Sequence, residues 1–262
     1  MRVKTICQLK YNAPNNVPFI MMLRPKSGIG QQIIEETFQL SPAINLTEYV
    51  DSFGNACQRF LSPIGDFQVE SIVIAETNES VDVNFDAEII PVENLPEETL
   101  IYLLPSRYCE SDLFLSMAVE ITQEYQTGYQ KAEAIREWVY NNISYQYGFS
   151  NSSSTACSVN HSGVGVCRDF SHLGISLCRA INIPARMVVG YLYQLEPMDL
   201  HAWYEVYLEN QWYTFDATQP EPKGNRLVLA HGRDASDVAF ATHFGFVYLN
   251  EMQVSVELAS TN

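Results

Sequence analysis

The sequence has no apolar stretch long enough to cross a membrane. Its longest apolar run, 17–23, is interrupted by Pro18 and is far shorter than the ~20 residues that a spanning helix needs. Residues 1–10 lack the sustained apolar segment of a cleavable secretion signal. We therefore expect a cytoplasmic protein that does not associate with membranes.

Basic residues are scarce. The chain carries 15 Lys and Arg against 31 Asp and Glu, which gives a formal net charge of −16. Nucleic-acid phosphates would be repelled by such a charge, so we expect no nucleic-acid partner. The same charge favours cationic or neutral substrates.

Cysteines are also few, six in 262 residues, which is too few for a disulfide scaffold. We therefore expect reduced thiols. Cys157, His161, Cys167 and His172 lie close in sequence, but their order Cys-x3-His-x5-Cys-x4-His matches no common zinc spacing. We expect no metal and no other cofactor, and we interpret His172 as a packing or hydrogen-bonding residue.

The pattern along the chain divides it into two parts. Short β-type runs separated by turn residues predict an antiparallel β-sandwich over residues 1–100. Prolines then punctuate a connection, and residues 101–262 are predicted to form a second domain. This domain begins with helices from Ser111 to about Tyr125 and from Gln130 to Asn142. The expected strands of the first part are 17–23, 31–40, 56–61, 68–75 and 80–85.

Cys167 is placed where a glycine-containing loop becomes an amphipathic helix. Apolar residues recur with helical spacing over 170–181, and Asn182 and Pro184 then supply a stop signal. Backbone N–H groups and the helix dipole stabilise a thiolate in the first turn, so this position favours nucleophilic acyl-transfer chemistry. The alternative is a buried structural cysteine, which is the commoner fate of this residue.

His201 and Asp216 lie on the two arms of a predicted β-hairpin. Residues 201–208 and 212–218 are rich in β-branched and aromatic side chains. If the loop is Glu209 and Asn210 alone, Asp216 becomes a diagonal neighbour of His201, roughly 7–8 Å away at the backbone. A loop one residue longer would place them on opposite faces. In the first register Asp216 can orient the imidazole, and His201 can take a proton from Cys167.

Each partner alone has a plainer interpretation. A single histidine on a strand is more often a core or surface residue, and an aspartate at a strand end is more often a turn residue. The combination of all three is a much rarer coincidence.

Five stretches of the second part carry the three candidate residues and their surroundings. They are Gly165-Val166-Cys167-Arg168-Asp169-Phe170-Ser171-His172-Leu173, Ile183-Pro184-Ala185-Arg186, Gly190-Tyr191, His201-Ala202-Trp203-Tyr204-Glu205-Val206 and Phe215-Asp216-Ala217-Thr218. These stretches resemble the transglutaminase-like superfamily, and more closely its bacterial branch described as cysteine proteases with an N-terminal β-rich domain. The segments 51–55 and 102–108 extend this resemblance over nearly the whole chain.

The resemblance implies an α+β fold, in which the sandwich is followed by a papain-like core of helices packed on an antiparallel sheet. It also implies that Cys167 is the nucleophile, His201 the base and Asp216 the orienting residue. Ala217 stands where many relatives carry proline, which affects loop stiffness rather than chemistry. The sequence has no acidic cluster of the kind that calcium-dependent animal transglutaminases use, so calcium activation is not implied.

We therefore expect a thiol-dependent enzyme that acts on amide or peptide bonds through a thioester, by peptide hydrolysis or by transfer to an amine. Its partner would be a peptide or protein substrate. The alternative is a catalytically silent fold that serves as a protein-binding module. The backbone N–H of Cys167 would be one oxyanion donor, and segment 145–147 lies where a second could enter. Residues 151–154 are expected to form an exposed loop near the nucleophile.

Overall fold

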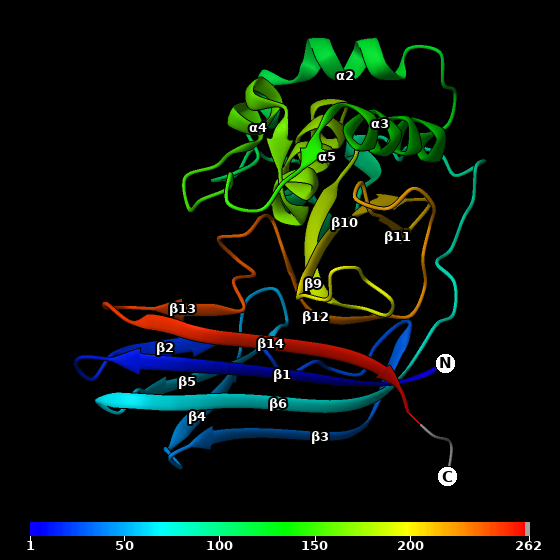
Figure 1. Cartoon of the computed structure of the whole chain (residues 1–262). Coiled ribbons are helices and arrows are strands. Elements are labelled where there is room, and N and C mark those ends of the chain that lie inside the picture. Colours follow the sequence, from blue (N-terminus) through cyan, green and yellow to red (C-terminus); the bar gives the residue numbers. More distant parts are fainter. Residues whose placement is uncertain (260–262) are drawn as a thin grey trace.

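Two four-stranded antiparallel sheets form a β-sandwich (Figure 1). The structure is a computed structural model that describes residues 1–259. One sheet has the order β14–β1–β6–β3 and the other the order β13–β2–β5–β4. The bounds are β1 Arg2–Ala13, β2 Pro18–Met21, β3 Gln31–Ser41, β4 Leu46–Val50, β5 Ala56–Leu61, β6 Gly65–Thr77, β13 Ala241–His243 and β14 Tyr248–Leu258.

Aromatic side chains fill the space between these two sheets. Tyr11 stacks on Phe67 with ring centroids 5.3 Å apart, and Phe19 stacks on Phe60 at 5.2 Å. All four side chains are buried. Along β1 and β6 buried and less buried residues alternate, as the two-residue period of a strand requires. The predicted antiparallel sandwich is therefore confirmed.

The last two strands of the chain complete the sandwich. β14 pairs with β1, and β13 pairs with β2. In Figure 1 the red C-terminal strand lies directly beside the blue N-terminal one. The predicted boundary at residue 100 therefore does not separate the two parts, because both ends of the chain build the sandwich.

Two other details differ from the predicted strands. The structure has a twelve-residue strand at β1 and a five-residue strand at β4 that the sequence pattern did not mark. The predicted strand 80–85 is wrong, because this segment has no strand partner. Phe85 instead contacts the helical part. Its ring packs on Tyr129 with centroids 5.2 Å apart, and the backbone carbonyl of Phe85 accepts a hydrogen bond from Thr127 Oγ1.

A third antiparallel sheet carries the helices. Its order is β11–β10–β9–β12, and α5 lies against β9 and β10. The predicted helix over 130–142 is confirmed as α3, whereas the one expected over 111–125 is a 3-10 turn at Ser111–Leu113 followed by α2. The bounds are β9 Ala185–Leu192, β10 His201–Leu208, β11 Gln211–Phe215, β12 Arg226–Gly232, α2 Leu115–Thr122, α3 Gly128–Asn142, α4 Ala156–Ser162 and α5 Cys167–Ala180.

The shorter elements lie between these. A two-stranded parallel sheet joins β7 (Ser144–Tyr145) to β8 (Val164–Gly165). A short helix, α1 (Glu97–Leu100), lies in the connection between the sandwich and the helical part, flanked by 3-10 turns at Val92–Asn94 and Ile101–Leu103. Within residues 1–259, no helix is long and apolar enough to span a bilayer.

The sandwich is attached to the edge of the third sheet by two amide side chains. The Gln31 amide accepts from Val228 N at 2.7 Å and donates to Val228 O at 3.0 Å. The Asn55 amide likewise accepts from the N–H of His231 and donates to its carbonyl, both at 2.9 Å. Each amide uses one N–H and its oxygen for these contacts, as a residue of a neighbouring strand would. Together they satisfy backbone groups of β12 that would otherwise form an open sheet edge.

Candidate active site

The start of α5 positions Cys167. A carboxylate oxygen of the fully buried Asp169 accepts from the backbone N–H of Val166 at 2.9 Å, which ties the first turn to the preceding loop. Gly165 leaves room for this contact, since a Cβ there would lie 2.8 Å from the Cβ of Asp169. Cys167 is the first residue of the helix and is half-buried. The predicted place of Cys167 at the start of a helix is confirmed, and Asp169 supports that start.

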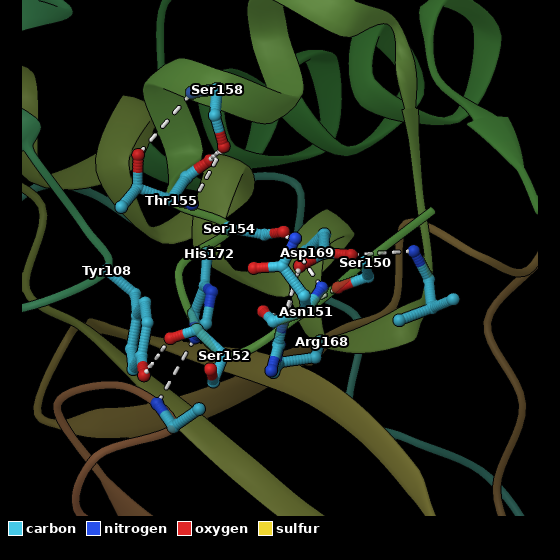
Figure 2. Close-up of polar contacts among 12 residues, drawn as sticks. Tyr108, Ser150, Asn151, Ser152, Ser154, Thr155, Ser158, Arg168, Asp169 and His172 are labelled. Carbon is cyan, nitrogen blue, oxygen red and sulfur yellow. Dashed lines mark hydrogen bonds and ion pairs between the residues drawn. The ribbon is translucent and has the colours of Figure 1, made fainter. Parts of the chain in front are cut away.

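Arg168 joins this helix start to the loop that precedes α4 (Figure 2). Its Nη2 donates to Ser150 Oγ and to the carbonyl of Asn151, both at 2.6 Å. The same nitrogen pairs with Asp169 at 3.2 Å. Residues 151–153 of the loop are exposed, as expected. The loop is therefore held against the turn that carries the nucleophile.

His172 is a buried packing residue. Its ring stacks on Tyr108 with centroids 5.1 Å apart and planes at 6°, and its Nε2 accepts from the backbone N–H of Ala235 at 3.2 Å (Figure 2). Burial lowers the pKa of His172 to about 3, so the ring is neutral at ordinary pH. This agrees with the role predicted for it.

The hairpin of β10 and β11 has the register that brings His201 to Asp216. Glu209 and Asn210 both have left-handed backbones, with φ of 46° and 67°. Such residues form the two-residue turn that matches strand twist. Tyr204 consequently pairs with Phe215, and this register makes Asp216 the diagonal neighbour of His201, as predicted for that loop length. His201 Nε2 and Asp216 Oδ2 lie 2.8 Å apart, and both side chains are buried.

Asp216 is held as a carboxylate by several donors. Arg226 Nη2 donates to Oδ2 at 2.8 Å, and the hydroxyl and backbone N–H of Thr218 donate to Oδ1 at 2.7 and 3.0 Å. Burial would raise the pKa of Asp216, but His201 and Arg226 outweigh it and lower that pKa. A negative charge therefore stays next to the imidazole over the whole ordinary pH range.

His201 responds to this charge and to Cys167. Burial alone would lower its pKa, but the charge and hydrogen bond of Asp216, together with the nearby thiol of Cys167, raise the pKa of His201 to about 9. Since Nε2 is engaged by Asp216, Nδ1 is the ring nitrogen left for Cys167. The structure thus brings the three predicted residues into one site.

Sequence reasoning missed Arg226. Its guanidinium lies 4.8 Å from the ring centroid of Trp203, and the Trp203 ring lies 6.1 Å from that of His201. The apolar run 227–230 indicates a strand. However, no local spacing shows that β12 would deliver an arginine to Asp216, because this contact depends on the pairing of β12 with β9.

A pocket of about 500 Å³ opens beside His201. The pairing of β7 with β8 brings Tyr145 to its wall, near Cys167. Of the segment 145–147, the backbone N–H of Gln146 already donates to Gly165 O. The lining residues are Tyr140, Asn141, Ile143, Tyr145, Tyr147, Phe170, Leu195, Glu196, Pro197, His201, Thr218 and Gln219. Over residues 1–259, no group of three or more His, Cys, Asp or Glu side chains is arranged to hold a metal ion.

The chain is similar to several known proteins. The family model of the transglutaminase-like superfamily matches residues 115–217, the span that contains Cys167, His201 and Asp216. A solved structure from Cytophaga hutchinsonii, named a "putative cysteine protease", is 33% identical, has a TM-score of 0.93, and is matched over 100% of this chain and 92% of its own.

Two further relatives are uncharacterized proteins. ML0607 of Mycobacterium leprae is 25% identical over 91% of this chain and 90% of its own length. YebA of Bacillus subtilis is 21% identical over 75% of this chain but only 28% of its own length. From the match to the family model and the end-to-end similarity to the C. hutchinsonii protein, we conclude that this chain belongs to the transglutaminase-like superfamily.

Proposed function

We propose that the protein is a cysteine-dependent acyl-transfer enzyme that hydrolyses peptide bonds, with Cys167 as nucleophile, His201 as base and Asp216 as the residue that orients His201. The observation that carries the proposal is the buried 2.8 Å contact between His201 and Asp216, beside the helix start that bears Cys167. The similarity to the C. hutchinsonii protein supports a protease.

The proposed reaction has two halves. The thiolate of Cys167 attacks the carbonyl carbon of the substrate, and backbone N–H groups at the start of α5 stabilise the oxyanion. Protonated His201 gives its proton to the departing amine, which leaves a thioester on Cys167. His201 then removes a proton from a water molecule, which attacks the thioester. The acid product leaves, and the Cys167 thiolate and protonated His201 are restored.

Transfer to an amine would use the same thioester. The experiment that separates the two reactions supplies peptides and glutamine amides with and without a primary amine. Peptide fragments alone indicate hydrolysis, ammonia release without a new bond indicates deamidation, and an amine-containing product indicates transfer. If none of these products forms and Cys167 is unreactive, the proposed enzyme is contradicted and the protein-binding alternative is favoured.

We expect Cys167 to be the one cysteine of the six that iodoacetamide alkylates rapidly at pH 6. Cys167 is half-buried and lies in contact with His201, which can take its proton, whereas burial raises the pKa of both Cys7 and Cys109 to about 12. The half-buried Cys157 is the main competitor, but burial and the neighbouring Glu110 raise its pKa too. Peptide mapping after short labelling checks this result. Faster labelling of Cys157 would contradict the assignment.

We expect kcat/KM to fall as pH rises through about 9. The pKa of His201 is raised from 6.5 to about 9, so the ring keeps its proton below that pH and loses it above. The departing amine needs that proton. A pH–rate profile with a peptide substrate measures the basic limb. A limb between pH 6 and 7 would show that Asp216 does not act on His201 as proposed.

Arg226 supplies the matched variants for this profile. It shares Asp216 Oδ2 with His201, so it takes part of the negative charge that the imidazole would otherwise experience. Arg226→Met should therefore move the basic limb above 9, and Arg226→Lys should return it toward 9 because the charge is restored. A purely structural role would lower activity in both variants without moving the limb.

A further inference from the structure

Four of the twelve residues that line the pocket beside His201 are tyrosine or phenylalanine. Tyr140 comes from the end of α3, Tyr145 and Tyr147 from β7 and the residues after it, and Phe170 from α5. Tyr145 contacts Tyr147 and Phe170, with ring centroids 5.5 and 5.7 Å apart. The volume of about 500 Å³ is within the range of ligand pockets. A long substrate side chain can therefore enter next to the proposed nucleophile.

Apart from the proposed catalytic residue His201, the charge that lines the pocket is negative. Among the described residues that line it, Glu196 is the carboxylate, and none is a lysine or arginine. Glu196 lies on the exposed connection between β9 and β10. His201 is the one lining residue that can become cationic, but Asp216 already pairs with it.

This combination suits a cation on a long apolar stem. The faces of tyrosine rings attract an ammonium or guanidinium group, and a carboxylate at the rim pairs with it. The methylene stem of such a side chain can lie along apolar walls, which Phe170, Leu195 and Pro197 provide. The net charge of −16 further raises the local concentration of cationic peptides.

Building on the proposed function, we propose that this pocket is a substrate subsite for a lysine or arginine side chain close to the scissile bond. Glu196 is then a specificity-determining residue rather than part of the reaction. An aromatic or aliphatic side chain could fill the same pocket, but it would leave the Glu196 carboxylate unpaired and would partly desolvate it. The two kinds of side chain can therefore be distinguished, because only the reaction of a cationic side chain should depend on Glu196.

The test uses the full chain and peptidyl chloromethyl ketones that carry lysine, norleucine or glutamate at the position next to the reactive group or one residue before it. The rate of covalent labelling at Cys167 is measured by mass spectrometry. We expect the best lysine reagent to label about tenfold faster than its norleucine counterpart, and glutamate to be slowest. In Glu196→Gln the ratio of lysine to norleucine should fall to about two or less. The matched control is Glu35→Gln, which removes the same charge from the exposed strand β3 and should leave the ratio unchanged.

Each outcome has one meaning. Equal or faster labelling by norleucine, or a ratio that survives Glu196→Gln, overturns the subsite. An equal loss of the ratio in Glu35→Gln assigns the preference to net charge and also overturns it. Because labelling needs no turnover, a protein that shows the lysine preference but hydrolyses no peptide would retain the subsite and contradict the proposed peptide hydrolysis instead. Failure of every reagent at Cys167 would contradict the nucleophile and the subsite together.

Discussion

Replacing Asp216 with asparagine should lower kcat for peptide hydrolysis by about 10³–10⁴-fold while the protein stays folded. Asparagine can still accept the two hydrogen bonds from Thr218. It removes the charge that raises the pKa of His201, and its amide favours the wrong imidazole tautomer. The measurements are kcat, the unfolding midpoint and the rate of Cys167 alkylation at pH 6, which should also fall.

Asp169→Asn is the control for this variant. Asp169 is equally buried, but it contacts Val166 and Arg168 at the helix start rather than His201. The asparagine oxygen can replace the carboxylate at Val166, so we expect a smaller loss of kcat than in Asp216→Asn. A larger loss for Asp169→Asn would mean that Asp216 does not orient the base.

The pair of His201 and Asp216 could be predicted because its geometry is local. A two-residue turn at Glu209 and Asn210 fixes the register of the whole hairpin, and the register fixes which residues are diagonal neighbours. The position of Cys167 could be predicted in the same way, because the pattern of nearby residues marks the start of the helix. Arg226 could not be found in this way, because it reaches Asp216 through the packing of β12 on a strand far away in sequence.

The same distinction explains the fold. Alternation within single segments was enough to predict β2, β3, β5 and β6. It could not show that β14 pairs with β1, because this pairing joins the two ends of the chain, as the ion pair of Lys10 with Glu251 illustrates. It also misassigned residues 80–85, whose apolar side chains alternate as in a strand. The ring of Phe85 instead packs on α3.

A chain that begins at Pro91 should fail to fold. The sandwich covers Tyr191 of β9 and Leu227 and Leu229 of β12, all of which are buried in its core. Exposing such a side chain costs about 1.5–3 kcal/mol. The summed cost for the three approaches the free energy of unfolding of a typical domain, about 5–15 kcal/mol. β13 and β14 would also lose their partners. We expect no cooperative thermal transition and no selective alkylation of Cys167. A truncated protein that retains both would show that residues 91–262 are an independent domain.

Removing the amide contacts to β12 should weaken the attachment of the sandwich in the full-length protein without removing the sandwich. The double variant Gln31→Ala and Asn55→Ala removes four hydrogen bonds to the backbone of Val228 and His231. At about 0.5–1.5 kcal/mol for each bond, the free energy of unfolding should fall by about 2–6 kcal/mol. Gln32→Ala is the matched control, since Gln32 is exposed on the same strand as Gln31. Denaturant titration measures both proteins. If the double variant unfolds at the same denaturant concentration as Gln32→Ala, the amides contribute nothing to holding the sandwich on the third sheet, and other contacts hold it, such as the apolar contacts of Tyr191, Leu227 and Leu229.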